Sequence, residues 1–157
     1  MYKLILIIIF PIILKIIWVI FKTFNHGNIK KEKKELVSRA RYLVSKIGKN
    51  PKELINSMPS NIGSQFQGEW ALYTCSMTCI ALSNIVKLYP EYKEYALKNI
   101  ENIIDIILSK ELREYDKLRW GEDPIENLSK NNKHLSYLSH LVLTIGRYKQ
   151  IGGTNNE

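Results

Sequence analysis

The stretch "ALYTCSMTCIALSNIV", residues 71–86, contains no Lys, Arg, Asp or Glu and decides the fold. We expect it to lie in a helix that begins near Gly68 and ends near Tyr89. The spacing of its apolar residues is helical, and one stripe consists of Leu72, Cys75, Cys79, Leu82 and Val86. The opposite side carries Ala, Ser, Thr and Met rather than charged residues. A helix without a charged face has little reason to face water, so we expect this one to be covered on most sides.

The helices that follow differ in how much of their surface is polar. Pro90 is tolerated in a first turn and begins the next helix. The core side of that helix is formed by Ala96, Leu97, Ile100, Ile103, Ile104, Ile107 and Leu108, and its wet side by Lys93, Glu94, Lys98, Glu101 and Asp105. A last helix, from about His134 to Gln150, again lacks Lys, Arg, Asp and Glu between Leu135 and Gly146 and stops at a glycine doublet.

The remaining segments complete an all-α prediction. A helix from about Lys30 to Ile47 ends at Gly48, with Pro51 beyond it. The polar stretch after residue 108 holds a short helix around residues 111–118. No sustained alternation of apolar and polar residues indicates a strand. We therefore expect an N-terminal hydrophobic helix followed by about four further helices.

The N-terminal segment Tyr2–Phe21 has only Lys3 and Lys15 as charged residues, and its length suits a bilayer core, which needs about 20 apolar residues of helix. No pattern of small residues for cleavage follows it. Residues 1–22 are therefore predicted to be a transmembrane anchor or uncleaved signal that contacts membrane lipid through residues 2–21. A cleaved signal peptide and a buried helix are the alternatives.

The net charge of +8 is concentrated near this segment. Residues 1–34 hold seven Lys and one Glu, which gives +6 and leaves +2 for the rest of the chain. The excess predicts a basic juxtamembrane linker, residues 23–34, at anionic headgroups rather than a nucleic-acid partner. The same bias favours a cytoplasmic position for the helical domain, residues 35–153, and its tail, residues 154–157; a signal function would instead export them.

The last three long helices are expected to be covered, amphipathic and covered, in that order. This order is typical of an α/α-toroid, in which inner helices are buried between neighbours and outer helices are amphipathic. In a four-helix bundle every helix would be amphipathic, with one apolar and one polar face. The predicted helices supply only the first hairpins of such a ring. We therefore expect an incomplete toroid, or a fragment of one, completed by a second chain or by self-association.

Successive inner helices of such a ring run parallel, so their N-termini meet at one rim. The carboxylates expected there are candidate acid/base groups: Glu69, Glu122 and Asp123. Candidate substrate-binding side chains at or near the rim are Trp70, Trp120, His134 and His140. Aromatic rings supply a stacking surface, and enzymes acting on sugars often use paired carboxylates.

Each candidate also has a structural interpretation. Glu69 can stabilise the first turn of its helix, and residues 120–124 can form a turn with Trp120 as a lid on the core. His134 can be a neutral core histidine and His140 a polar contact between helices. The two histidines are six residues apart, about 240° around a helix, so they cannot share one metal ion. No metal site or cofactor is predicted, and Cys75 and Cys79 are interpreted as buried hydrophobes.

The elements "GEWALYT", "LRWGEDP" and "SYLSHLVLTIGRYKQIGG", spread over residues 65–153, resemble those of six-hairpin α/α-toroid proteins. That group includes glycosidases, sugar epimerases and linalool dehydratase/isomerase-like enzymes. The resemblance implies the ring fold and transfers no individual catalytic residue. Two functions follow: a membrane-anchored helical protein without catalysis of its own, or part of a carbohydrate-active or isomerase-type toroid enzyme.

Overall fold

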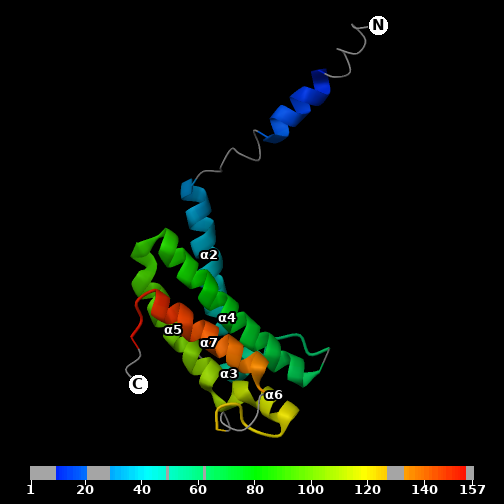
Figure 1. Ribbon diagram of the computed structural model, residues 1–157, viewed down its shortest axis with the longest axis vertical. Coiled ribbons are helices and arrows are strands. Elements are labelled where there is room, and N and C mark those ends of the chain that lie inside the picture. Colours follow the sequence, from blue (N-terminus) through cyan, green and yellow to red (C-terminus); the bar gives the residue numbers. More distant parts are fainter. Residues whose placement is uncertain (1–9, 21–28, 49, 62, 127–132, 155–157) are drawn as a thin grey trace. The chain divides into compact units, whose positions relative to one another are not determined.

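The computed structural model describes residues 10–20, 29–48, 50–61, 63–126 and 133–154 (Figure 1). The chain divides into two compact units, Met1–Leu36 and Val37–Glu157. Within the described ranges all regular structure is helical, which confirms the predicted all-α class. The closed or open ring of a toroid stays a prediction.

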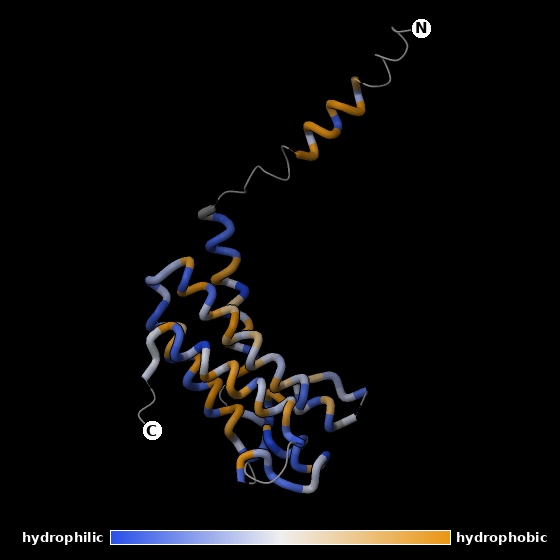
Figure 2. Tube along the Cα trace, viewed as in Figure 1, coloured by the Kyte–Doolittle hydropathy of each residue, from blue (hydrophilic) through white to orange (hydrophobic). Residues whose placement is uncertain are grey.

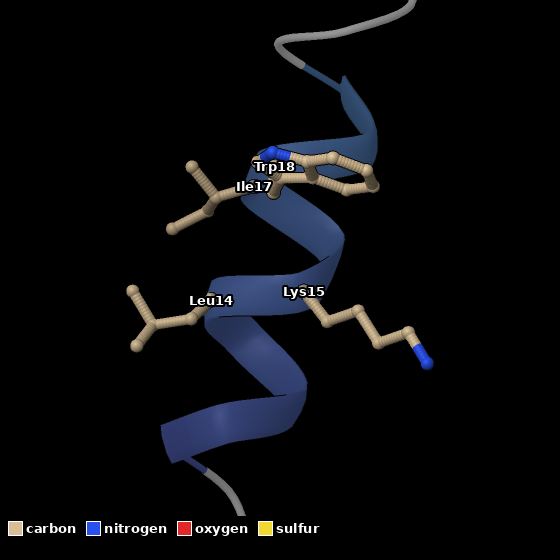
Figure 3. Close-up of a pocket in the computed structure, with 4 residues that line it drawn as sticks. All are labelled: Leu14, Lys15, Ile17 and Trp18. Carbon is tan, nitrogen blue, oxygen red and sulfur yellow. The ribbon is translucent and has the colours of Figure 1, made fainter.

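The first unit holds an apolar helix, Phe10–Ile20, whose residues are all exposed. Figure 2 shows it as almost uniformly hydrophobic, and Lys15 is its single charged residue. Leu14 and Ile17 project to one side and Lys15 to the other (Figure 3). These side chains and Trp18 line an open hollow on the surface of this helix. Residues 2–9 and Phe21 of the predicted anchor lie outside the described residues.

One described helix is long and apolar enough to cross a membrane, and it is the segment Gln65–Leu88 rather than the shorter Phe10–Ile20. However, 56% of the most apolar window of Gln65–Leu88 is buried inside the protein. That burial is typical of a core helix, and it agrees with the expectation that most sides of this segment are covered.

The second unit begins within α2 (Ile29–Ile47), which buries Val37, Ala40 and Ile47. Gly48, with φ +62°, ends α2 in the left-handed region that glycine adopts without strain. The Asn102 side-chain amide donates a 2.8 Å hydrogen bond to the Gly48 carbonyl and so ties this turn to the domain.

The centre of the second unit is α4 (Ser64–Leu88). Packed against it are α3 (Pro51–Asn56), the 3-10 turn η1 (Pro90–Tyr92), α5 (Lys93–Leu108), α6 (Lys110–Trp120) and α7 (Leu135–Gln150). The predicted apolar stripe is confirmed, because Leu72, Cys75, Cys79, Leu82 and Val86 are all buried. Burial raises the pKa of the Cys75 thiol to about 12 and also raises that of Cys79, as expected for cysteines that act as small hydrophobes.

Helices α4 and α7 lie side by side and run parallel (Figure 1). Ser76 shares a 2.7 Å hydrogen bond with His140, and one turn further along both helices the Thr144 side chain acts on the Cys79 thiol. Residue numbers therefore rise together along the pair. This is the relation predicted for the two helices that lack charged residues.

Helix α5 runs opposite to α7. The Tyr137 hydroxyl at the start of α7 donates to the Ile107 carbonyl at the end of α5, over 2.7 Å, whereas the Tyr148 hydroxyl near the end of α7 donates to Glu101. The predicted two faces of α5 are confirmed except at two positions: Leu108, expected on the core side, is exposed, and Ile106 is buried. Its core side includes Ala96, Ile100, Ile103 and Ile107, and the predicted charged side is exposed.

The start of α4 differs from the prediction, because the helix begins at Ser64 and Gly68 lies inside it. Helix α6 crosses α4 at this glycine. A Cβ added to Gly68 would lie 2.5 Å from the Tyr115 Cβ. The glycine therefore permits close helix packing instead of marking a boundary, and Glu69 lies beyond the first turn where a capping role was expected.

The predicted coverage of the uncharged helices is wrong in one respect. One side of α4 stays open along its length, with Phe66, Trp70, Tyr73, Met77 and Leu88 exposed. Helix α7 likewise leaves Leu135 and Val142 in solvent, Val142 at 67% exposure. The faces that pack on α3, α5 and α6 are covered, and no described segment covers the remaining side.

Gly68→Ala is expected to lower the free energy of unfolding by about 2 kcal/mol, because the new methyl group overpacks the contact with Tyr115. Gly146→Ala is the matched control: Gly146 lies in α7 with nothing near its Cβ position, so alanine should stabilise by about 1 kcal/mol through helix propensity. Denaturant unfolding of the full chain in mild detergent measures both. Equal effects of the two substitutions would contradict the packing role of Gly68.

Candidate functional site

Several of the candidate residues lie in one region of the domain, around the start of α4. The charge of Glu69 on α4 acts on both Tyr115 of α6 and His140 of α7. His134 lies at the N-cap of α7, beside Asp116 of α6. The structure therefore brings the ends of α4, α6 and α7 together, and the candidate residues separate into smaller groups within this region.

The first group is a buried carboxylate–imidazole pair. The His134 Nδ1–H donates a hydrogen bond to the Asp116 carboxylate, and both side chains are buried, His134 at 1% exposure. Within the described residues the buried His134 Nε2 has no hydrogen-bond partner, and the nearest charge is Glu122 Oε1 at 3.8 Å. The same Glu122 oxygen lies 3.8 Å from Lys133 Nζ.

An aspartate that orients a histidine through Nδ1 is the arrangement of many general bases. Here the Nε2 atom that would exchange a proton is shut off from solvent. The pair therefore serves to hold the start of α7 against α6. His134 is the buried, hydrogen-bonded histidine that its structural interpretation described.

The second group joins α6 to the segment that follows it. Arg113 Nη1 lies 2.5 Å from Asp123 Oδ1, and that oxygen also accepts hydrogen bonds from the Ile125 and Glu126 amides at 2.9 and 3.3 Å. Burial opposes ionisation, but the two amides and the guanidinium outweigh it and lower the pKa of Asp123. A carboxylate held ionised in this way is a poor proton donor and a good structural anchor.

Sequence reasoning missed Arg113 and Asp116 because α6 reads as a polar surface helix. One signal for them exists in "LREYD", where Leu112 and Tyr115 mark a buried face and Arg113 and Asp116 each follow one of them. All four are buried in the structure. Ionisable residues adjacent to the apolar positions of a short helix thus indicate a buried polar contact.

The third group surrounds His140. Its Nδ1 pairs with the buried Ser76, and its ring meets the Tyr73 ring edge-on, with centroids 4.3 Å apart. Burial lowers the pKa of His140, and the charge of Glu69 opposes this only in part. His140 is therefore a polar contact between α4 and α7, as its structural interpretation stated, and Ser76 and Tyr73 are partners that sequence reasoning did not name.

The fourth group lines a hollow of about 320 Å³ on the first turns of α4, formed by Phe66, Glu69, Trp70 and Tyr73. Trp120, at the end of α6, is not among the lining residues and packs instead with Arg119, whose guanidinium carbon lies 5.5 Å from the ring centroid. Glu69 and Trp70 are thus together, whereas the predicted second tryptophan of the site is elsewhere.

No group of three or more His, Cys, Asp or Glu side chains in the described parts of the chain is arranged to hold a metal ion. Comparison with known protein families, curated proteins and solved structures finds no match for this chain. The function must therefore be argued from the geometry alone.

Asp123→Asn is expected to cost about 3 kcal/mol of stability, because it leaves the Arg113 guanidinium buried without its counter-charge. Glu114→Gln makes the same charge change on the exposed side of α6 and should change stability by less than about 0.5 kcal/mol. Combining Asp123→Asn with Arg113→Met should recover part of the loss. Thermal and denaturant unfolding check the series, and a null effect of Asp123→Asn would refute the anchoring role.

Stability is also expected to fall in mild acid because of His140. Its folded pKa is lowered below the ordinary 6.5, so its contribution is present above pH 6.5 and is lost as the pH falls through the folded value. One such group contributes a slope of up to about 1.4 kcal/mol per pH unit. His140→Asn keeps a polar atom near Ser76 without titrating, so its unfolding free energy should vary less between pH 6.5 and 5. Identical pH profiles for the two proteins would rule this out.

Proposed function

We propose that this chain is a membrane-anchored helical module without catalysis of its own, extended by a second copy that packs on α4 and α7. The observation that carries the proposal is the open side of α4 and α7. Met77 is 49% and Val142 67% exposed, and the pairing of Ser76 with His140 sets these residues at one level along the parallel helices. Large apolar side chains exposed on neighbouring helices are typical of interaction surfaces.

The anchor of this proposal is the segment 2–21, supported by the exposed apolar surface of the helix Phe10–Ile20. An apolar helix with no protein cover is stable in lipid rather than in water. The lysines that follow it would lie at anionic headgroups, and their excess favours a cytoplasmic position for the helical domain.

Two of the polar groups proposed for the site are paired or buried, which supports the absence of catalysis. Asp123 forms an ion pair with Arg113, and the Nε2 atom of His134 has no access to solvent. An incomplete ring of helices also cannot exclude water from a reaction centre. The Arg113–Asp123 contact holds residues 123–126 to α6, and the Asp116–His134 contact holds the start of α7 to α6.

The alternative is part of a carbohydrate-active or isomerase-type toroid enzyme, with Glu69, Glu122 and Asp123 as acid/base groups. One observation favours it: Glu122 and His134 lie close together at the predicted rim. The ion pair of Asp123 counts against it, because a carboxyl group with a lowered pKa is a weak acid catalyst at neutral pH.

The mass of the full chain in mild detergent, measured by light scattering over a range of concentrations, tests the proposal. We expect a dimer or larger oligomer that Met77→Glu combined with Val142→Glu converts to a monomer, because buried carboxylates without partners are costly. Lys98→Glu on the wet side of α5 is the control and should leave the mass unchanged. A wild-type chain that is monomeric throughout and unfolds sharply would show that the domain needs no second copy.

A further inference from the structure

The hollow on the first turns of α4 has the size and lining of a small-molecule site. Its volume is about 320 Å³, and it is lined by Phe66, Glu69, Trp70 and Tyr73, which follow one another on one face of the helix. Small-molecule pockets begin near about 300 Å³, so one compact organic group fits. All three aromatic side chains are partly exposed, which leaves ring surface available to a ligand.

The Tyr73 ring, which forms one wall of the hollow, is supported by His140. The Tyr73 ring contacts the His140 ring at an interplanar angle of 62°, and His140 is fixed in turn by its hydrogen bond with the buried Ser76. Because burial lowers the pKa of His140, the imidazole stays uncharged at neutral pH and places no positive charge behind the tyrosine. The wall is therefore ordered without repelling a cation.

The charge of the hollow is that of Glu69. This carboxylate is half-buried, and no hydrogen bond or ion pair engages it among the described residues. No cationic side chain is among those that line the hollow. A partly desolvated carboxylate beside three aromatic rings attracts a positive group and repels an anion.

We propose that this hollow binds an alkylated ammonium group, with its methyl groups against Phe66, Trp70 and Tyr73 and its charge beside Glu69. Ring faces attract cations, and quaternary ammonium groups gain most because they are weakly hydrated. A primary ammonium keeps its water more strongly. A sugar would need several hydrogen-bonding partners, whereas the side chains of this lining offer one carboxylate, one tyrosine hydroxyl and one indole N–H.

This inference goes beyond the proposed self-association. The hollow lies on the same open side of α4 as Met77, one turn nearer the start of the helix than the centre of the proposed interface at Met77 and Val142. The ammonium group has two sources, a free choline-like solute or the choline headgroup of a bilayer lipid, and both present the same chemistry to the hollow.

Calorimetric titration of the full chain in a non-ionic detergent, with choline and with its neutral tert-butyl isostere, tests the proposal. The isostere has the same shape without the charge, so choline should bind at least about tenfold more tightly. Glu69→Gln should remove that preference, and Trp70→Leu should weaken choline binding by about tenfold. Trp120→Leu, an exposed tryptophan outside the hollow, is the control and should bind as the wild type does.

Circular dichroism establishes that each variant folds. The proposal would be overturned by equal affinity for choline and the isostere. It would also be overturned by choline binding that survives both Glu69→Gln and Trp70→Leu, or by tighter binding of neutral sugars than of choline. The absence of choline binding by the folded wild type would overturn it as well. Binding retained by the Met77→Glu, Val142→Glu chain would show that the site stands whether or not the chain self-associates.

A second set of titrations identifies the source. Nanodiscs of phosphatidylcholine and of phosphatidylglycerol with the same acyl chains each receive the full chain, followed by choline. Weaker choline binding in phosphatidylcholine alone would assign the hollow to a lipid headgroup. Unchanged binding in both would assign it to a free solute, and in either case the ammonium preference remains.

Discussion

A helix that carries no charged side chain from Ala71 to Val86 must be shielded from water, and the rest of the domain is arranged around that requirement. Helices α3, α5, α6 and α7 all pack on α4. Its small residues allow the approach, most visibly at Gly68, where the Tyr115 side chain occupies the space of a missing Cβ. The short connection through η1 turns α5 back along α4, and α7 then runs parallel to α4 and antiparallel to α5.

Polar contacts fix the relative positions of the helices, which apolar packing alone does not determine. Apolar surface is non-directional and tolerates sliding, whereas the Ser76–His140 contact sets the register of α7 on α4. At the end of the domain, Asp116–His134 and Arg113–Asp123 place the start of α7 and the segment after α6. Buried charged pairs add little net stability. An arrangement that separates the two partners is nevertheless strongly destabilised, because it leaves a buried charge without its counter-charge. The two pairs therefore favour the arrangement in which Asp123 meets Arg113 and the start of α7 meets α6.

Periodicity in the sequence predicted the helices, the two faces of α5 and the buried stripe of α4, because local spacing alone determines these features. It did not predict where α4 begins, since a glycine that admits a neighbouring helix looks the same as one that ends a helix. It also missed Arg113 and Asp116, whose partners lie ten and eighteen residues away on other segments. The pairings of the candidate residues could not be predicted, because they depend on tertiary contacts.

The burial of the two cysteines has a practical consequence. Cys75 and Cys79 are the only thiols of the chain, and burial keeps both protonated and unreactive toward labelling reagents. A cysteine placed at any exposed position would then be the sole site of modification in the folded protein. The natural sequence is therefore already a background for accessibility mapping from either side of a bilayer, without replacing a native residue.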